Sequence, residues 1–313
     1  MSPLDPLPPG IVTPLVTFIT EGGEPDADAM TRHVNYQIES GIHGLLAVGS
    51  TGELGSFTAD QRVRAIEIVV DAAAGRVPVW AGVAGLGTSE TVEAARRAES
   101  AGADALLVLQ PLFLAASDAE LERHFTQVAA ATSAPVIVYD VPARSPRKLP
   151  ATVMASLGEQ GVIRGFKDSS GDLTAGRLSA AATAHIDGFR SYIGSEITMD
   201  AAFVLGFQGI VPGFANVLPR HAVALFEAVQ RGDRDAEAAA QQAFIDLFEM
   251  LSVPLPDAGG FTAAVNAIKV ATAEVLGLPT PLIGEPLVQP TAQFSRAIAD
   301  IVAPLHASTP GEE

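Results

Sequence analysis

Short, nearly continuous apolar segments alternate with alanine-rich segments along most of the chain. Continuous apolar segments of this length are typical of parallel strands that are buried on both faces. The alanine-rich segments have the spacing of helices, and Thr58 with Gln61 forms a capping box at the start of one of them. The predicted strands are Ile11–Phe18, Leu45–Gly49, Val77–Val83, Ala105–Leu109, Val136–Tyr139, Ile163–Phe166, Phe189–Ile193 and Ile210–Phe214. The predicted helices that follow them are Asp26–Glu39, Thr58–Ala74, Ser89–Ser100, Asp118–Ala131, Pro150–Leu157, Asp172–Ala184, Thr198–Gly206 and Leu218–Gln230.

Eight strand–helix units in succession favour an α/β fold with a closed (β/α)8 TIM barrel over an open sheet. The alternation stops after residue 230, where Ala236–Leu251, Phe261–Val275 and Pro290–Leu305 are predicted helices without strands between them. We therefore expect residues 1–230 to form the barrel and to carry the active site. Residues 231–313 should form a helical extension that packs on the barrel or on another subunit.

Charge and composition exclude several classes of partner. The formal net charge of −17 disfavours nucleic acid and anionic membrane surfaces as partners. Cysteine is absent, so the chain has no disulfides and no thiol chemistry, which suits a reducing cytoplasm. No apolar run approaches the roughly 18 residues of a spanning helix. Residues Met1–Pro9 also lack the basic and apolar regions of a signal peptide, so we expect a cytoplasmic protein.

Lysine is rare in this chain, and its three positions differ in their surroundings. Lys148 lies in a proline-rich loop, where we expect it to be solvated, and Lys269 lies in an alanine-rich helix as a surface or subunit-contact residue. Lys167 alone follows a predicted core strand, in Gly165-Phe166-Lys167-Asp168. A desolvated amine can lose its proton and attack a ketone to form a Schiff base. The alternative is a lysine that extends from a strand end into water.

Further candidates lie where other strands end, which is the end of a TIM barrel that carries its chemistry. Gly49-Ser50-Thr51-Gly52 offers two hydroxyls and a run of backbone N–H groups that could bind a carboxylate, although it could equally be an ordinary turn. Tyr139 could move protons beside a Schiff base, or it could anchor a loop. Arg144 could pair with a substrate carboxylate, or it could be a solvated arginine.

Metal and nucleotide chemistry find little support in the sequence. The six histidines show no paired metal-ligand spacing, and we expect no metal site. Gly82–Gly87 has the wrong order of glycines for a dinucleotide fingerprint, and no P-loop is present. Glu53 is a better candidate for a hydrogen-bond acceptor that fixes its loop than for a catalytic acid.

Three motifs carry a resemblance to a known family. Gly49–Glu53, Tyr139–Arg144 and Gly165–Asp168 resemble, in residues, order and spacing, the motifs of the dihydrodipicolinate synthase / N-acetylneuraminate lyase family. The similarity extends from about Ile11 to Leu305. It implies a class I aldolase that acts on pyruvate or a related small keto acid without a metal or an organic cofactor. It also implies a homotetramer, built as a dimer of dimers, or a homodimer.

The resemblance also assigns roles to individual residues. Lys167 matches the Schiff-base lysine and Tyr139 the proton-shuttling tyrosine. Ser50 and Thr51 match the hydroxyl pair whose loop holds the keto-acid carboxylate, and Ser50 supports Tyr139. Arg144 matches the arginine that dihydrodipicolinate synthases use for the carboxylate of the second substrate. The expected catalytic residues are thus Lys167, Tyr139 and Ser50, and the expected substrate-binding residues are Thr51, Gly52, Arg144, Ser195, Glu196 and Gly213.

One departure from the family pattern bears on the substrate. Lysine-pathway synthases typically have Pro-Tyr-Tyr-Asn after strand four, and the second tyrosine reaches a neighbouring subunit's proton relay; this chain has Pro111-Leu112-Phe113-Leu114, without a hydroxyl. Ser195 and Glu196 could hold a polyhydroxylated chain. We therefore favour an aldolase of 2-keto-3-deoxy sugar acids. Dihydrodipicolinate synthase, a keto-acid dehydratase and a non-catalytic keto-acid-binding homologue remain alternatives.

Overall fold

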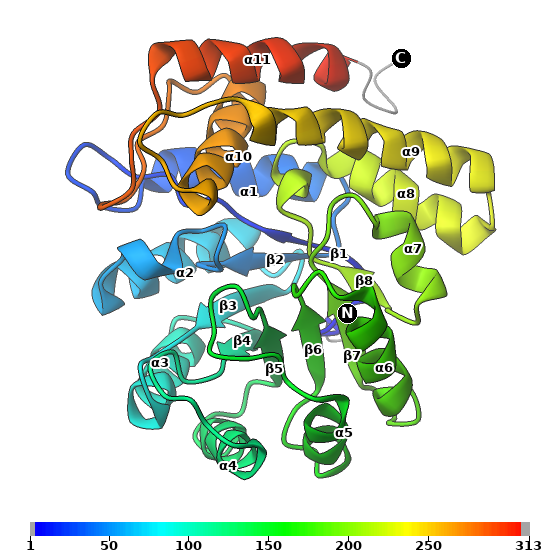
Figure 1. Ribbon diagram of the computed structural model, residues 1–313. Helices are drawn as coiled ribbons and strands as arrows, with labels where there is room; N and C mark the ends of the chain where they lie inside the picture. The colour runs from blue at the N-terminus through cyan, green and yellow to red at the C-terminus, as the bar shows by residue number, and fades with distance from the viewer. Residues whose placement is uncertain (1–3, 308–313) are drawn as a thin grey trace.

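Eight parallel strands form a closed barrel in the computed structural model, which describes residues 4–307 (Figure 1). The strands follow one another in chain order, and β1 and β8 close the barrel through Gly10↔Gly209 and Ile11↔Ile210. The strands are β1 (Gly10–Pro14), β2 (Gly44–Ala47), β3 (Val79–Val83), β4 (Ala105–Leu109), β5 (Val136–Asp140), β6 (Gly165–Asp168), β7 (Arg190–Ile193) and β8 (Gly209–Ile210). The predicted TIM barrel is confirmed.

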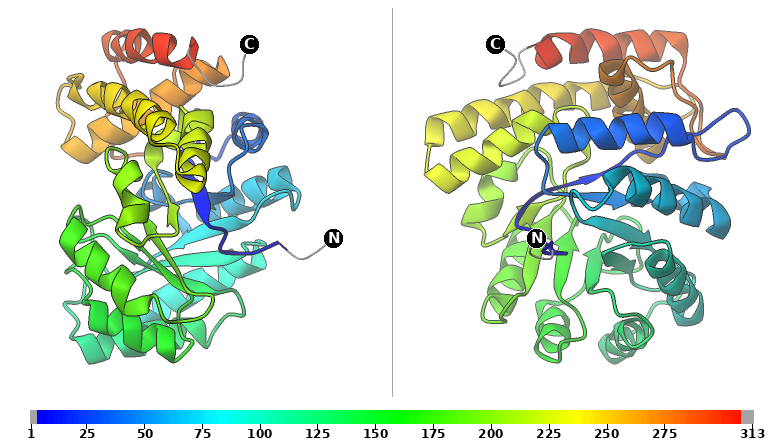
Figure 2. Two further views of the ribbon diagram at one scale, coloured as in Figure 1. Left: turned by 90° about the vertical axis from the view of Figure 1, so that its right-hand side faces the viewer. Right: turned by 180° about the vertical axis from the view of Figure 1, so that it is seen from behind.

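A ring of helices surrounds the barrel, and further helices follow it. The helices of the strand–helix units are α1 (Ala27–Glu39), α2 (Ala59–Ala73), α3 (Thr88–Ser100), α4 (Asp118–Ala129), α5 (Ala151–Glu159), α6 (Leu173–Thr183), α7 (Met199–Val204) and α8 (Pro219–Arg231). The C-terminal segment contains α9 (Arg234–Leu247), α10 (Gly260–Leu276) and α11 (Ala292–Ala307). Short 3₁₀ helices are η1 (Leu54–Ser56), η2 (Gly213–Asn216) and η3 (Phe248–Ser252). Figures 1 and 2 show α9, α10 and α11 together on the side of the barrel that α1 and α8 cover.

The limits of the predicted strands agree with the structure only for Ala105–Leu109, and three of the differences bear on the site. β1 ends at Pro14 instead of Phe18, because the N–H of Val16 donates to the side chain of Asn216 and not to a neighbouring strand. β8 ends at Ile210, because Pro212 has no N–H to continue the ladder and the chain turns into η2. β6 runs past its last apolar residue, so that Lys167 and Asp168 lie inside the strand.

The barrel interior is filled and one of its ends is closed by the N-terminal segment. Trp80 and Tyr192 pack edge to face inside the barrel with their ring centroids 4.9 Å apart. Trp80 Nε1 donates to the backbone oxygen of Pro6, and the Tyr192 hydroxyl donates to that of Pro8. The second, larger apolar core lies between the strands and the surrounding helices. The open end at the carboxyl termini of the strands is left for a site.

Residues 1–3, which begin the segment predicted to lack a signal peptide, and residues 308–313 lie outside the described part of the chain. Within residues 4–307, no helix has the length and apolar character required to cross a membrane.

Candidate active site

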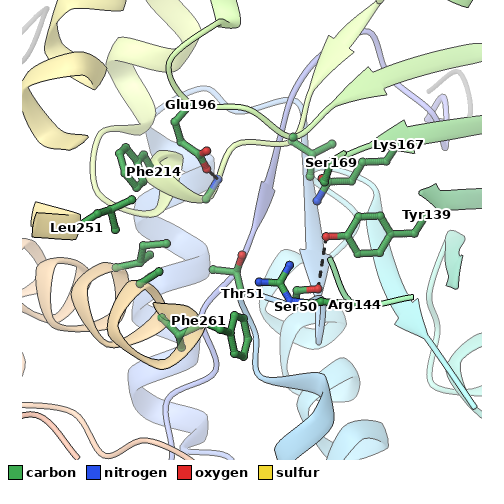
Figure 3. A pocket seen from close by; sticks show the side chains of 16 residues that line it. Ser50, Thr51, Tyr139, Arg144, Lys167, Ser169, Glu196, Phe214, Leu251 and Phe261 are labelled. Atoms are coloured by element: carbon green, nitrogen blue, oxygen red, sulfur yellow. Dashed lines mark hydrogen bonds between the residues drawn. The ribbon is translucent and has the colours of Figure 1, made fainter. Parts of the chain in front are cut away.

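The three predicted catalytic side chains meet at the carboxyl end of the barrel. Tyr139 on β5 and Lys167 on β6 are direct neighbours in the strand register. The Lys167 Nζ atom lies 4.6 Å from the centroid of the Tyr139 ring, and the Tyr139 hydroxyl is 3.3 Å from Ser50 Oγ, within hydrogen-bonding distance. Tyr139 and Lys167 are each only 5% exposed. Figure 3 shows all three directed at one another around a common space.

That space is a cavity of about 230 Å³ with a polar side and an apolar side. The polar side chains that line it are those of Ser50, Thr51, Tyr139, Arg144, Lys167, Ser169 and Glu196. The apolar side chains are those of Val211, Phe214, Leu251, Phe261, Ala264, Val265 and Ile268. A concave site with a few convergent polar groups among apolar ones is the usual form of a small-molecule site.

The electrostatics favour acid–base chemistry at Tyr139. Burial acts to raise the pKa of the Tyr139 hydroxyl, but the Lys167 ammonium, the Ser50 hydrogen bond and Arg144 outweigh this effect. The pKa of Tyr139 is consequently lower than the ordinary value of 10.0. A phenol whose pKa lies closer to neutrality exchanges protons more effectively with a bound substrate.

Lys148 is not the solvated lysine that its loop predicted. Its Nζ atom donates to Asp140 Oδ2 and, at 2.7 Å, to Asp168 Oδ2. The two carboxylates come from β5 and β6, whose ladder places Asp140 beside Asp168. The prediction was wrong because the loop composition does not show which buried charges the loop passes.

Lys269 is likewise neither a surface residue nor exposed for subunit contact in this chain. Its Nζ donates to Glu53 Oε1 at 2.7 Å, and both side chains are completely buried. Glu53 Oε2 accepts a second hydrogen bond from the backbone N–H of Gly284 at 2.7 Å. Glu53 is therefore the loop-fixing acceptor that we predicted, and it ties the Ser50–Glu53 loop to α10.

Lys167 differs from both of these lysines. Within residues 4–307, no carboxylate lies within ion-pair distance of Lys167, whereas Lys148 and Lys269 each have a carboxylate partner. Lys167 is also the only lysine among the residues that line the cavity. Of the three amines, it is the one placed to react with a ligand.

The predicted substrate-binding residues fall into two groups. Thr51, Arg144, Glu196 and Gly213 line the cavity, whereas Gly52 and Ser195 do not. A side chain at Gly52 would meet the backbone oxygen of Leu15 at 2.8 Å, so this glycine allows close packing of two loops. Ser195 Oγ instead accepts a hydrogen bond from the Thr198 hydroxyl at 2.8 Å.

Glu196 lies across the cavity from Lys167 (Figure 3). Its Oε1 atom accepts a hydrogen bond of 2.7 Å from the backbone N–H of Gly213. Burial raises the pKa of the Glu196 carboxyl, and this hydrogen bond and the charge of Lys167 offset only part of the shift. Glu196 is thus suited to hydrogen bonds with a hydroxylated ligand, as acceptor or as protonated donor.

The C-terminal extension contributes to the site, although the sequence pattern predicted a site within residues 1–230. Arg144 lies over the ring of Phe261 on α10, with its guanidinium carbon 4.3 Å from the ring centroid. Three further residues of α10, Ala264, Val265 and Ile268, line the same wall. The alanine-rich pattern predicted this helix but not the surface that it covers.

Ser169 and Gly194 are among the cavity residues to which the sequence assigned no role. Ser169 interacts with the Tyr139 hydroxyl, and its position directly after Lys167-Asp168 was the available signal. A side chain at Gly194 would meet Ser169 Oγ at 2.3 Å and Lys167 Cε at 2.8 Å. Any larger residue there would displace Ser169 and Lys167. The available signal was a glycine immediately after an apolar strand. Among residues 4–307, no group of three or more His, Asp or Glu side chains could hold a metal ion.

The chain is similar to known proteins in sequence and in structure. A sequence model described as the dihydrodipicolinate synthetase family matches residues 7–303. A 4-hydroxy-tetrahydrodipicolinate synthase from Acidothermus cellulolyticus is 33% identical over 302 residues, which cover 96% of this chain and 94% of the relative. An uncharacterized DapA-like lyase from Halobacterium salinarum is 35% identical over 232 residues, 74% of this chain and 75% of the relative. A similar solved structure is that of YagE, a prophage protein of the dihydrodipicolinic acid synthase family from E. coli K12, in complex with pyruvate. It superposes with a TM-score of 0.87 at 26% sequence identity, over 95% of this chain and 98% of the YagE chain.

Proposed function

We propose that this chain, which belongs to the dihydrodipicolinate synthetase family, forms or cleaves the carbon–carbon bond between pyruvate and an aldehyde. The enzymes of this family are lyases that act through a lysine Schiff base. The observation that carries the residue assignment is the position of Lys167, which lacks a carboxylate partner within the described residues and lines the cavity beside Tyr139 and Ser50.

The proposed reaction begins when Lys167 Nζ attacks the C2 carbonyl of the keto acid. Tyr139 donates a proton to the departing water of the carbinolamine, and the imine that forms withdraws electrons from C3. The Tyr139 phenolate then takes the proton of the C4 hydroxyl as the C3–C4 bond breaks, which releases the aldehyde and leaves an enamine. Protonation of the enamine at C3 restores the imine, and water hydrolyses it to pyruvate and free Lys167. Ser50 holds the Tyr139 hydroxyl in place through their hydrogen bond.

The lining of the cavity supports one orientation of the bound substrate. We assign the pyruvate carboxylate to the Ser50–Thr51 loop, which the buried Glu53–Lys269 pair fixes from behind. The aldehyde half then extends towards Glu196, Arg144 and the wall formed by α10. YagE, the related structure solved with pyruvate, supports this keto acid for the shared half of the substrate.

For the aldehyde half we favour a 2-keto-3-deoxy sugar acid. Glu196 offers hydrogen bonds to hydroxyl groups inside the cavity, which favours such a chain. Dihydrodipicolinate synthase is the second candidate, because Arg144 lines the cavity and several relatives carry the name 4-hydroxy-tetrahydrodipicolinate synthase. A dehydratase would use the same imine, and a non-catalytic homologue would bind a keto acid without turnover.

Assembly and location belong to the same proposal. Phe113 is 81% exposed and the adjacent Leu114 is 54% exposed, although both are large apolar residues. A second copy of the chain would cover them, which supports the predicted homotetramer or homodimer. The proposed location is the cytoplasm, where a chain without cysteine suits the reducing conditions.

Reduction with borohydride in the presence of pyruvate tests the proposed nucleophile. We expect a 1-carboxyethyl group on the peptide that contains Lys167, with the Lys148 and Lys269 peptides of the same digest unmodified. Lys167→Met is the matched control and should give no adduct. An adduct confined to Lys148 or Lys269, or none on the folded wild-type protein, would contradict the assignment. Assaying released pyruvate from a panel of 2-keto-3-deoxy acids then separates an aldolase from a dehydratase and from a binding protein.

A further inference from the structure

Lys148 occupies an unusual position directly behind the catalytic pair. Successive side chains of a strand point to opposite faces, so Asp140 and Asp168 point away from the face that carries Tyr139 and Lys167. In agreement, a side chain at Gly176 on the surrounding helix α6 would meet Asp168 Oδ2 at 3.2 Å. Lys148 bridges the two carboxylates there, across the gap between β5 and β6.

The two carboxylates would repel each other without this bridge. The side chain of Asp140 is 0% exposed and that of Asp168 is 4% exposed, and the two residues are adjacent in the register of β5 and β6. Burial raises the pKa of the Asp140 carboxyl, and the Lys148 ammonium opposes that rise. Two buried carboxylates that share one ammonium partner cannot both remain ionised once that positive charge is removed.

The same carboxylates belong to residues that hold the ends of the strands at the site. The backbone oxygen of Asp140 accepts from the Ser169 N–H at 2.9 Å, and that of Asp168 accepts from the Gly194 N–H at 2.8 Å. Ser169 and Gly194 both line the cavity. Asp140 Oδ1 also accepts from the N–H of Leu149, which fixes the loop that delivers Lys148. A displacement of either aspartate would therefore move the cavity wall next to the nucleophile.

We propose that Lys148 is a positioning residue for the Schiff-base reaction. By bridging Asp140 and Asp168 and compensating one of their two negative charges, it holds the ends of β5 and β6 in the positions that place Lys167 Nζ beside the Tyr139 ring. It contacts neither the cavity nor a substrate, since it is not among the cavity-lining residues. This inference rests on the proposed function, because it concerns the geometry of the proposed nucleophile and its proton donor.

The test uses the exchange of pyruvate methyl protons for deuterium in D2O, followed by NMR. This reaction needs only the imine: C3 of the imine loses a proton to form an enamine and regains a deuteron from solvent. The assay therefore works with pyruvate alone and does not require the aldehyde substrate to be identified. Lys148→Met removes the charge and keeps the length of the side chain. We expect kcat for exchange to fall by about 10²-fold, the effect of misplacing reacting groups by roughly 1 Å, with KM for pyruvate changed much less.

A second substitution separates positioning from general damage to the fold. In the Asp140→Asn, Lys148→Met double variant, the amide keeps an acceptor for Leu149, offers an N–H donor to Asp168 and removes one of the two charges. We expect this double variant to regain kcat to within about threefold of the wild type, as expected when a coupled pair is changed together. Lys148→Arg, which keeps the charge and the bridge, should also retain most of the exchange rate. Thermal unfolding of each variant shows which comparisons involve folded protein.

Lys148→Gln provides the same comparison should Lys148→Met not fold, because it keeps an N–H donor and lacks the charge. The positioning role is overturned if these variants exchange pyruvate like the wild type, or if the double variant remains as slow as the single one. Absence of exchange by the wild-type protein would instead contradict the proposed function. The two failures are therefore distinguishable.

Discussion

Tyr139 and Lys167 face each other across β5 and β6, with Lys167 Nζ 4.6 Å from the centroid of the Tyr139 ring. The ammonium is close enough to lower the pKa of the phenol, and the phenol is close enough to serve a substrate bound to the amine. Because the two are register partners, the strand pairing that builds the barrel also sets the distance between them. The barrel fold therefore determines the geometry of this residue pair directly.

Tyr139→Phe tests the role of the phenol as a proton carrier. We expect kcat for pyruvate exchange to fall by roughly 10²–10⁴-fold, because that is the usual effect of a positioned acid–base group. Tyr192→Phe is the matched control: its hydroxyl donates to the backbone oxygen of Pro8, away from the cavity, and kcat should remain near the wild-type value. A Tyr139→Phe enzyme with normal kcat would reduce Tyr139 to a structural residue.

Gly194→Ala tests the space that the nucleophile requires. The added methyl group would lie 2.8 Å from Lys167 Cε and 2.3 Å from Ser169 Oγ, so both side chains must move. We expect slower adduct formation with pyruvate and borohydride, by about 10²-fold, since displaced reacting groups lose much of their effective concentration. Gly55→Ala is the control, because a side chain there would meet no atom within 4 Å. Equal rates for the two variants would contradict this account of Gly194.

His33 should make the folded protein sensitive to acid. Burial lowers the pKa of His33 from 6.5 to about 3, so the folded chain excludes a proton that the unfolded chain binds. Its contribution to stability is therefore complete above pH 6.5 and is lost as the pH falls from about 6.5 towards 3. Between pH 6 and pH 4 the loss should amount to about 2 to 3 kcal/mol.

Denaturant unfolding at several pH values measures this effect in the wild type and in His33→Leu. Burial also lowers the pKa of His43, His124 and His221, so the difference between the two proteins isolates His33. The variant should lose less stability than the wild type between pH 6 and pH 4. Parallel curves for the two proteins would show that His33 does not titrate differently in the folded and unfolded states.

The sequence predicted those site residues that directly follow an apolar strand segment. Apolar segments predicted the strands, and the ends of the strands must meet in a parallel barrel, so the sequence alone brings Ser50, Tyr139 and Lys167 together. Side-chain contacts between segments far apart in the sequence could not be predicted in this way. Lys269 pairs with Glu53 across 216 residues of sequence, and nothing in its alanine-rich helix shows that partner.

Ser195 and Glu196 show how finely the direction of a side chain depends on the backbone. Both follow β7, yet only Glu196 lines the cavity, whereas Ser195 accepts a hydrogen bond from Thr198. Residues that follow a strand no longer alternate regularly, and the direction of each then depends on the turn that the chain takes. The position of Phe261 in the cavity wall could not be predicted either. Helical periodicity predicts the helix but not the part of the barrel against which it packs.

The proton relay of a lysine-pathway synthase offers a test of the aldehyde substrate. Such an enzyme condenses pyruvate with aspartate semialdehyde. By the resemblance described above, its proton relay includes a tyrosine at the position where this chain has Phe113. Removal of one proton-transfer group should cost about two to four decades in rate. Arg144 can bind the carboxylate of aspartate semialdehyde, but binding that is equal in the ground and transition states does not raise kcat. We therefore expect weak condensation and measurable release of pyruvate from a 2-keto-3-deoxy acid.

Steady-state rates on both substrates, measured for the wild type and for Phe113→Tyr, decide between these two activities. The Phe113 side chain is 81% exposed and lies outside the cavity of its own chain, so the new hydroxyl can act only in the site of another copy. An increase in condensation by Phe113→Tyr, with the cleavage rate unchanged, would agree with a missing relay member and with an assembly in which subunits share their sites. Leu114→Tyr, one residue further along the same exposed segment, is the matched control and should change neither rate. Robust condensation by the wild-type protein would show that Phe113 is tolerated, and the synthase would then be the better assignment.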